Sequence, residues 1–250
     1  EDLKQFRQLH SKTPGHPENE HTVGVEVATG PLGQGLSNAV GMALGQAHAA
    51  ATFNREGFNV VEHNTFVICG DGCLQEGITS EASSLAGHLG LGSLIVLYDD
   101  NNITIDGGTE LSFTEDVGKR YESYGWQVLE VEDGDTDLAG LQEAIEAAKA
   151  ERSKPTMIKV RTTIVYGADK QGTAGVHGAP LGLVDLARLK KEWGFEEDKC
   201  FEVPKDVAAV YAGCKPAGVA KHAAWTAMFE RYRNAHPEIA AEFERRQRGE

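Results

Sequence analysis

The chain has few basic residues, few aromatic residues and no long apolar run. Lys and Arg number 24 against 38 Asp and Glu, so the formal net charge is −14 at pH 7. A surface of this sign repels nucleic acid and anionic membranes, and we expect neither as a partner. A phosphorylated substrate stays open, because a few local positive groups can override the overall sign. The apolar runs are too short to span a bilayer, and the opening residues lack the apolar core of a signal peptide.

Cysteine is scarce as well. The four cysteines are Cys69, Cys73, Cys200 and Cys214, and no two of them form a CxxC pair. No cluster of His and Cys has the spacing of a zinc site, so we expect free thiols in a reducing compartment. The chain begins with Glu1 rather than methionine. This start indicates processing or truncation, and any targeting segment is expected to be absent.

Short apolar runs alternate with amphipathic segments through the middle of the chain. The apolar runs of strand length are 65–69, 94–98, 127–131 and 156–163. The helix-like segments between them are 75–91, 116–124 and 137–152. Near-continuous apolar strands separated by helices predict an α/β fold, with a mostly parallel sheet and helices on both faces.

The pattern changes in the last third of the chain. Residues 167–182 are rich in glycine and small side chains and predict a long loop, after which a short helix is expected at 184–193. Proline and glycine interrupt the chain from there to Pro216. The last segment, 218–250, has a charged helical pattern that breaks near Pro237. We expect this tail to be a connecting arm rather than an independent core.

Polar, glycine-flanked loops follow two of the predicted strands. A Gly-Asp-Gly motif at 70–72 ends the first strand, and Asn101 and Asn102 follow the second. In parallel sheets, ligands bind at the carboxyl ends of strands. There Asp71 would supply a carboxylate, Asn101 an amide oxygen and Ile103 a backbone carbonyl, the oxygen ligands that a divalent cation beside a diphosphate requires. Gly-Asp-Gly alone is also a common turn, but a strand–helix–strand unit with both motifs recurs in thiamine-diphosphate enzymes.

A second glycine-rich turn, GPLGQG at 30–35, opens a helix that runs to about Ala50. Such a turn at a helix start suits anion binding, although a lone one is usually only a turn. Its order, GxxGxG, differs from the GxGxxG of dinucleotide-binding domains, and no acidic residue stands convincingly about 20 positions further on. A nicotinamide-binding dehydrogenase domain is therefore disfavoured.

Six stretches of the chain, in the same order, resemble the transketolase family. They are 11–18 (SKTPGHPE), 24–35 (GVEVATGPLGQG), 70–77 (GDGCLQEG), 81–88 (EASSLAGH), 98–107 (YDDNNITIDG) and 176–181 (VHGAPL). The resemblance runs from residue 1 to about 195 and more loosely through the tail. The wording of the first stretch is most similar to transketolases of photosynthetic eukaryotes.

The resemblance implies thiamine diphosphate as the cofactor, with Mg²⁺ or Ca²⁺ beside it. The implied metal ligands are Asp71, Asn101 and the backbone carbonyl of Ile103. The implied contacts to the cofactor are Gly30, Pro31, Leu32, Asp71, Gly72, Asn101 and His177. The implied domains are a diphosphate-binding domain over 1–195, lacking its upstream part, and a helical arm over 196–250 that leads towards a second domain.

Four further residues take catalytic roles if the resemblance holds. His16 lies in a turn-prone stretch, where a core histidine is not expected, and it would meet a hydroxyl or carbonyl of the sugar. His177, otherwise a solvated loop histidine, would contact the cofactor and the reacting end of the substrate. Glu76 near a helix start could instead be a helix cap, and Glu81 a solvated helix residue. In the family, such glutamates connect the two active sites of a homodimer.

The function implied is the reversible transfer of a two-carbon ketol unit from a ketose phosphate to an aldose phosphate, in the pentose phosphate pathway or the Calvin cycle. The expected compartment is the chloroplast stroma or the cytoplasm. The family's chains are longer, and the second domain of a partner subunit completes each site. We therefore expect this chain, as a fragment or as one half of a split enzyme, to be inactive alone.

Two alternatives share part of the pattern. A deoxyxylulose-phosphate synthase or a 2-oxo-acid dehydrogenase component would have the Gly-Asp-Gly and Asn-Asn motifs, but not TPGHPE or VHGAPL. A non-catalytic subunit could keep the fold, although the intact motifs argue against it.

Overall fold

The computed structural model describes all 250 residues, and they form two compact units. The first unit contains Glu1–Leu44 and Asn64–Cys200, and the second contains Gly45–His63 and Phe201–Glu250. The chain passes from the first unit to the second within helix α1 (Gln34–Phe53). The sequence-based division into 1–195 and 196–250 stays a prediction.

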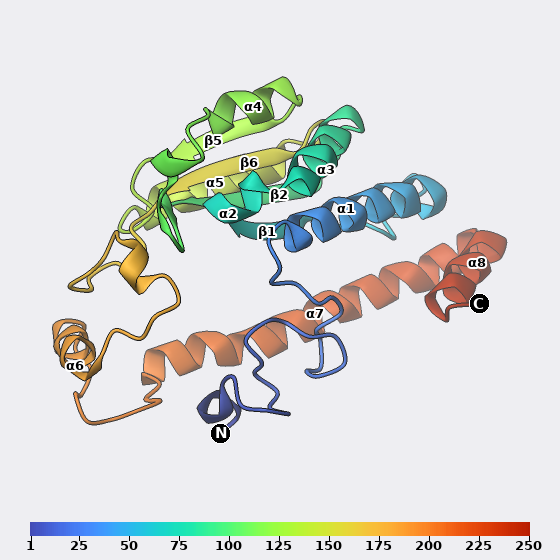
Figure 1. Cartoon of the computed structure of the whole chain (residues 1–250). Coiled ribbons are helices and arrows are strands. Elements are labelled where there is room, and N and C mark those ends of the chain that lie inside the picture. Colours follow the sequence, from blue (N-terminus) through green and yellow to red (C-terminus); the bar gives the residue numbers. More distant parts are fainter. The chain divides into compact units, whose positions relative to one another are not determined.

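The first unit is built on a four-stranded sheet (Figure 1). Its strands are β1 (Thr65–Gly70), β2 (Leu94–Asp100), β6 (Thr156–Arg161) and β5 (Gln127–Val131), in that spatial order. Every neighbouring pair is parallel. The predicted α/β fold with a parallel sheet is thereby confirmed, and the four strands begin where the apolar runs predicted them.

Short helices and turns connect the strands of the first unit. The helices are α2 (Asp71–Gln75), α3 (Gly77–His88), α4 (Val117–Ser123), α5 (Leu138–Ala150) and α6 (Leu183–Glu192). Three 3₁₀ turns (Asp2–Gln5, Thr109–Leu111, Ala174–Val176) and a small hairpin, β3 (Ile103–Thr104) with β4 (Gly107–Gly108), complete it. Asp116 and Asp137 cap α4 and α5, since their carboxylates accept hydrogen bonds from the backbone N–H groups of Lys119 and Gly140.

The prediction of one continuous helix over 75–91 is wrong in one respect. The chain breaks at Glu76, so that α2 ends before this residue and α3 begins after it. Glu76 has an extended backbone, with φ −72° and ψ 134°, and it separates α2 from α3. The Thr79 hydroxyl donates to the carbonyl oxygen of Cys73 over 2.7 Å and so satisfies an acceptor at the end of α2. This break allows α2 to carry Asp71 at the sheet edge while α3 packs in its own direction.

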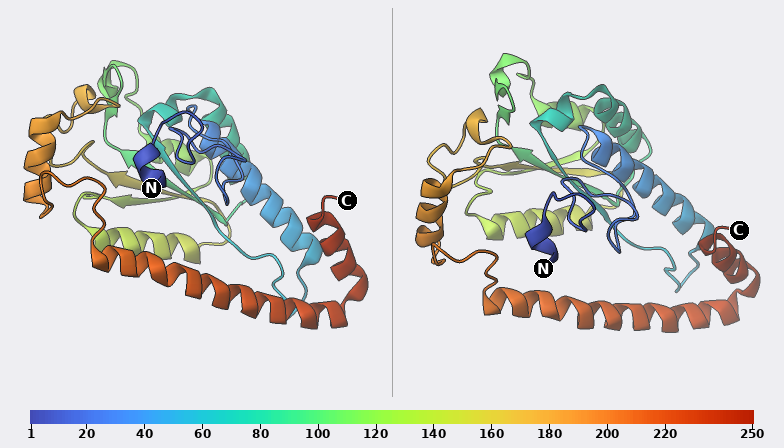
Figure 2. Two further views of the ribbon diagram at one scale, coloured as in Figure 1. Left: turned by 90° about the horizontal axis from the view of Figure 1, so that it is seen from below. Right: turned by 60° about the horizontal axis from the view of Figure 1, so that its bottom comes forward.

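The sheet is covered on both faces (Figure 2). Successive residues of a strand point to opposite faces, and both Ile95 and its neighbour Val96 in β2 are fully buried. Ile95 packs with Ile158 of β6 and Ala148 of α5 in one cluster, while α2 and α3 lie on the other face. Burial of a central strand on both faces is typical of parallel sheets.

The apolar stripe of α3 lies outside the core. Ile78, Leu85 and Leu89 are 50%, 47% and 43% exposed. The side of α3 that faces inward carries small residues, and Trp126 donates from its indole nitrogen to the carbonyl oxygen of Ser83 over 2.9 Å. The first unit thus leaves an unpartnered apolar face on this helix.

The second unit is helical, and its core consists largely of aromatic side chains. Helix α7 (Lys205–Ala235) is followed by α8 (Pro237–Gln247), and the core includes Phe53, Phe229, Tyr232 and Phe243. The Tyr232 hydroxyl donates to the carbonyl oxygen of Phe53 over 2.5 Å. No helix in the chain is both long and apolar enough to cross a membrane.

Two expectations concern prolines in this unit, and one of them is wrong. We expected interruptions up to Pro216, yet α7 runs through Pro216 without a break. An interior proline removes one backbone hydrogen bond and costs about 3 kcal/mol. The other turns of this 31-residue helix, in which alanine is frequent, must offset that cost. The predicted break near Pro237 is confirmed, because α8 begins with Pro237 at its first position.

The sheet core gives a first prediction. Ile158→Ala removes a fully buried side chain from β6, and we expect the free energy of unfolding to fall by about 2–5 kcal/mol. Ile68→Ala removes the same atoms from β1, where Ile68 is 77% exposed, and should cost no more than about 1 kcal/mol. Urea denaturation of both variants measures the difference; equal losses would contradict the placement of the core.

Candidate functional site

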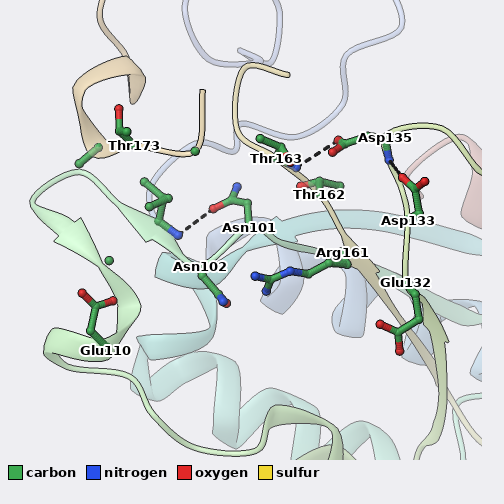
Figure 3. Close-up of a pocket in the computed structure, with 14 residues that line it drawn as sticks. Asn101, Asn102, Glu110, Glu132, Asp133, Asp135, Arg161, Thr162, Thr163 and Thr173 are labelled. Atoms are coloured by element: carbon green, nitrogen blue, oxygen red, sulfur yellow. Dashed lines mark hydrogen bonds between the residues drawn. The ribbon is translucent and has the colours of Figure 1, made fainter. Parts of the chain in front are cut away.

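A cavity of about 660 Å³ lies at the carboxyl ends of β2, β5 and β6 (Figure 3). Asn101 and Asn102 reach it from the end of β2, and the segments after β5 and β6 form other parts of its wall. The backbone N–H of Thr163 donates to the Asp135 carboxylate over 3.1 Å and ties the last two segments together. The cavity therefore stands where parallel sheets bind ligands.

The wall of this cavity is acidic. Glu110, Glu132, Asp133 and Asp135 line it, whereas Arg161 is its only cationic side chain. The Arg161 guanidinium is paired with Asp100 over 3.2 Å. A bare diphosphate would be repelled here, while a divalent cation would be attracted and would carry a diphosphate with it.

A second, smaller cavity of about 280 Å³ adjoins the first. Asp71, Tyr98 and Asp100 line it, and Asn102 borders both cavities. The structure therefore brings the Gly-Asp-Gly and Asn-Asn motifs to one region of the sheet edge, as the sequence predicts.

Asp71 begins α2 directly after β1 and is only 3% exposed. Its Oδ1 atom accepts a hydrogen bond from the Tyr98 hydroxyl over 2.5 Å, and its Oδ2 atom is buried without any partner. Burial raises the pKa of the Asp71 carboxyl, and the Tyr98 hydrogen bond acts in the opposite direction. A buried carboxylate oxygen without a partner is costly, so this atom fits a cation that would pair with it.

Asn101 lies on the loop after β2 and lines the larger cavity. Its Oδ1 atom accepts a hydrogen bond from the backbone N–H of Ile103 over 3.0 Å, and its Nδ2 atom donates to Asp99 over 3.2 Å. An amide oxygen has two lone pairs, so Oδ1 keeps one for a further ligand. These two hydrogen bonds hold the amide in a defined orientation.

The oxygen ligands predicted for the metal are thus of mixed type. No group of three or more His, Cys, Asp or Glu side chains is arranged to hold a metal ion. The predicted set contains one such side chain, Asp71, together with the Asn101 amide and the Ile103 carbonyl. Carboxylate, amide and carbonyl oxygens are what Mg²⁺ and Ca²⁺ bind.

The glycine-rich turn before α1 contacts two other residues predicted for the site, His16 and Gly72. Gly30 has φ +132°, and a Cβ atom at this position would clash with the His16 ring. A Cβ at Gly72 would lie 3.3 Å from Leu32. Only glycine at residue 30 permits both the backbone conformation and the approach of His16. The structure therefore brings His16 against Gly30, and Leu32 against the Gly-Asp-Gly turn.

The remaining predicted residues are exposed. Glu76 lies between α2 and α3, and Glu81 is on α3; neither carboxylate has a hydrogen bond or ion pair within the chain. His177 is exposed at the end of the last 3₁₀ turn, three residues after Ala174 in the cavity wall. No contact within the chain joins His177 to Asp71 or to His16.

Tyr98 and Arg120 are functional candidates that the sequence reasoning missed. Tyr98 is a buried polar side chain in an apolar strand, two residues before Asp100 and therefore on the same face. Burial raises the pKa of Tyr98, and its hydroxyl donates to the Asp71 carboxylate. Arg120 donates to the carbonyl oxygen of Leu74 in α2 and to the Ser80 hydroxyl in α3. The spacing of Tyr98 and Asp100 was a readable signal, whereas nothing local marks Arg120.

The family model and the individual relatives that match this chain all belong to one family. A family model described as "Transketolase, thiamine diphosphate binding domain" matches residues 1–250. The chain is 58% identical to transketolase 1 of Saccharomyces cerevisiae over 252 residues and 55% identical to a transketolase of Nostoc sp. over 246 residues. These matches cover 100% and 98% of the chain, but only 37% of each relative.

Solved structures of transketolases have the same fold. One from Leishmania mexicana superimposes with a TM-score of 0.97 at 53% identity. One from Pichia stipitis in complex with sedoheptulose-7-phosphate superimposes with a TM-score of 0.97 at 52% identity. Both matches cover 100% of the chain and 37% of the solved chain. The chain thus spans about a third of the length of the relatives it matches.

Proposed function

The chain belongs to the transketolase family as its thiamine diphosphate-binding domain, and from this premise we propose that it forms part of a transketolase. The whole enzyme would transfer a two-carbon ketol unit reversibly from a ketose phosphate to an aldose phosphate. The observation that carries this proposal is the buried, unpaired Oδ2 atom of Asp71 beside the loop of Asn101. The sugar phosphate bound in the Pichia stipitis structure supports this substrate class.

The residues at the sheet edge fit a metal–diphosphate group. The cation, Mg²⁺ or Ca²⁺, would be held by Asp71 Oδ2, Asn101 Oδ1 and the carbonyl oxygen of Ile103. The surface beside the cofactor would be formed by Gly30, Pro31, Leu32 and Gly72. When bound, thiamine diphosphate supplies a nucleophilic carbon and an electron sink. The chain's own residues bind and orient it.

The two histidines would move protons. We assign His16, which lies against Gly30, to the transfer of a proton at a hydroxyl or carbonyl oxygen of the sugar. We assign His177, on the glycine-rich loop near the cavity wall, to the reacting end of the substrate and to the cofactor. An imidazole suits both tasks because its two ring nitrogens can accept and donate protons.

The exposed apolar face favours a homodimer. Ile78, Leu85 and Leu89 on α3 are each about half exposed. Apolar side chains gathered in this way gain free energy when a second protein surface covers them. Glu76 and Glu81 belong to the same helical region, so we propose that they lie at the subunit contact and connect the two active sites. The second domain of the partner subunit would complete each site.

Pathway and compartment stay predictions. The relatives at comparable identity come from yeasts and bacteria, and one of them is Nostoc. We propose a role in the pentose phosphate pathway or the Calvin cycle, in the cytoplasm or the chloroplast stroma.

Cofactor binding gives a second prediction. Asp71→Asn and Asn101→Ala should each abolish the calorimetric heat of thiamine diphosphate binding in the presence of Mg²⁺, because the first removes the only charged metal ligand and the second removes the amide ligand. EDTA should abolish it in the unaltered chain. Glu143→Gln, which changes an exposed charge on α5, should bind normally. Unchanged binding by the Asp71 variant would disprove the assigned ligand set.

Catalysis gives a third prediction. The isolated chain should give no ketol transfer from a ketose phosphate, because it carries only part of the residues that the reaction needs. A chimera in which it replaces the matching third of transketolase 1 of Saccharomyces cerevisiae should be active, and Asp71→Asn in the chimera should be inactive. Product formation is followed by a coupled assay. A folded, cofactor-binding chimera without activity would count against the proposed function.

The apolar face gives a fourth prediction. In the same chimera, Ile78→Asp combined with Leu85→Asp should shift the dimer towards monomer, because each buried apolar contact is replaced by a charge that must lose water. Leu183→Asp on α6, where Leu183 is 85% exposed, is the matched control and should leave the dimer intact. Sedimentation velocity distinguishes the species. A dimer as stable as the unaltered one would exclude α3 from the contact.

A further inference from the structure

Arg188 on α6 binds the first residues of the glycine-rich segment 167–182, and the proposed mechanism does not use this side chain. Its Nη2 atom donates to the carbonyl oxygen of Gly167 over 2.7 Å. Its Nε atom lies 3.0 Å from the Asp169 carboxylate. One side chain of α6 therefore holds two groups of the segment that precedes this helix in the chain.

Asp185, one turn before Arg188 on α6, reinforces this contact. One of its carboxylate oxygens accepts a hydrogen bond from Arg188 Nη2 over 2.6 Å, and the other accepts from the backbone N–H of Asp169 over 3.1 Å. Exposed ion pairs contribute little to stability, but only 11% of the Asp185 side chain is exposed. Because a planar guanidinium presents its donors in a fixed arrangement, Arg188 and Asp185 together hold the segment in one position relative to α6.

The backbone at the start of the segment needs such a constraint. Val165, just before the segment, has φ +51°, a left-handed conformation that is costly for a β-branched residue. Gly167 has φ +87°, and a Cβ atom there would lie 3.1 Å from Leu189 of α6. A costly backbone conformation persists only where the surrounding contacts impose it. The contacts with α6 are placed to do so.

His177 lies midway between Asp169 and Asp185, and the chain between these two residues contains four glycines. Without a constraint, such a chain would sample many conformations. We propose that Arg188 is a positioning residue, which with Asp185 holds the beginning of the segment on α6 and thereby restricts where the His177 ring can lie. The inference rests on the proposed function, because it takes His177 to act on the cofactor and the substrate. It goes further, since it assigns the placement of His177 to a residue outside the proposed site.

Limited proteolysis of the chain tests the contact itself. Lys170 is the only lysine or arginine of the segment, so the rate of tryptic cleavage after Lys170 reports the population of the opened segment. We expect Arg188→Gln to accelerate this cleavage at least about tenfold, because a hydrogen bond to a charged group changes such an equilibrium by about that factor or more. Mass spectrometry follows the fragment that ends at Lys170. Equal rates in the variant and the unaltered chain would overturn the proposal.

Lys191→Gln is the matched control. Lys191 is an exposed residue of the same helix and makes no ion pair with the segment. Each of the two variants removes one positive charge and one tryptic site from α6, but only Arg188→Gln should expose Lys170 to trypsin. Equally fast cleavage after Lys170 in Lys191→Gln would show a general effect of the lost charge and would overturn the specific role of Arg188.

Ketol transfer by the chimera with transketolase 1 of Saccharomyces cerevisiae tests the effect on His177. Arg188→Gln should lower kcat/KM about 10- to 100-fold, because a small misplacement of a reacting group costs about that much. In a chimera that already carries His177→Ala, Arg188→Gln should cause no further loss, since the ring that Arg188 positions is gone. A purely structural role would lower kcat/KM equally in both backgrounds, and that result would overturn the link between Arg188 and His177.

Two further outcomes separate this inference from the proposed function. If the unaltered chimera folds and binds the cofactor but is inactive, the proposed function is wrong, and the link between Arg188 and His177 falls with it. If the chimera is active and Arg188→Gln changes neither the cleavage after Lys170 nor kcat/KM, only the role of Arg188 is wrong.

Discussion

The parallel register of β1 against β2 is the constraint on which the candidate site depends. Gly70 pairs with Asp99 and Cys69 pairs with Tyr98, so the residue after β1, Asp71, comes to lie over the end of β2. From there the Tyr98 hydroxyl reaches its carboxylate. A shift of one residue would turn every side chain of a strand to the opposite face. The buried central strands prevent such a shift, so the stability of the core and the geometry of the site have the same origin.

Helix α2 carries Asp71 at the end of β1, and this helix is too short to be stable alone. Arg120 of α4 holds it from the outside, with one hydrogen bond to the Leu74 carbonyl in α2 and another to Ser80 in α3. Because both helices are tied to α4 close to their junction, Asp71 is held at the sheet edge although its own helix spans only Asp71–Gln75. The unpaired oxygen of Asp71 is tolerated in this rigid frame, and a cation would satisfy it.

The sequence pattern predicted the strands and helix starts that depend on neighbouring residues in the chain. The run 127–131 is strand β5, and Asp137 caps the helix predicted to begin there. The failures have tertiary causes. The break at Glu76 depends on a hydrogen bond from Thr79 back to Cys73. Helix α3 packs through its small residues rather than through its apolar stripe, because bulky neighbours approach that side closely. Those neighbours come from other parts of the chain, so the local sequence pattern of α3 does not predict which side is buried. The location of the candidate site could be predicted because its residues directly follow the predicted strands. The contact of Tyr98 with Asp71 could not, because it depends on how β1 pairs with β2.

The two halves of the site differ in how complete they are within this chain. The half proposed to bind the metal is enclosed, since Asp71 is buried and the Asn101 amide is fixed by two hydrogen bonds. The half proposed to transfer protons is open, since His16 and His177 are exposed to water. Charges in water interact weakly, and the same charges interact several times more strongly once another surface excludes the solvent. In the proposed function, binding of a cation would need only the enclosed half, whereas proton transfer to a sugar would need the second surface. A domain of this design would therefore bind its cofactor before its active site is complete, and burial of the exposed apolar side chains of α3 would provide free energy for completing it.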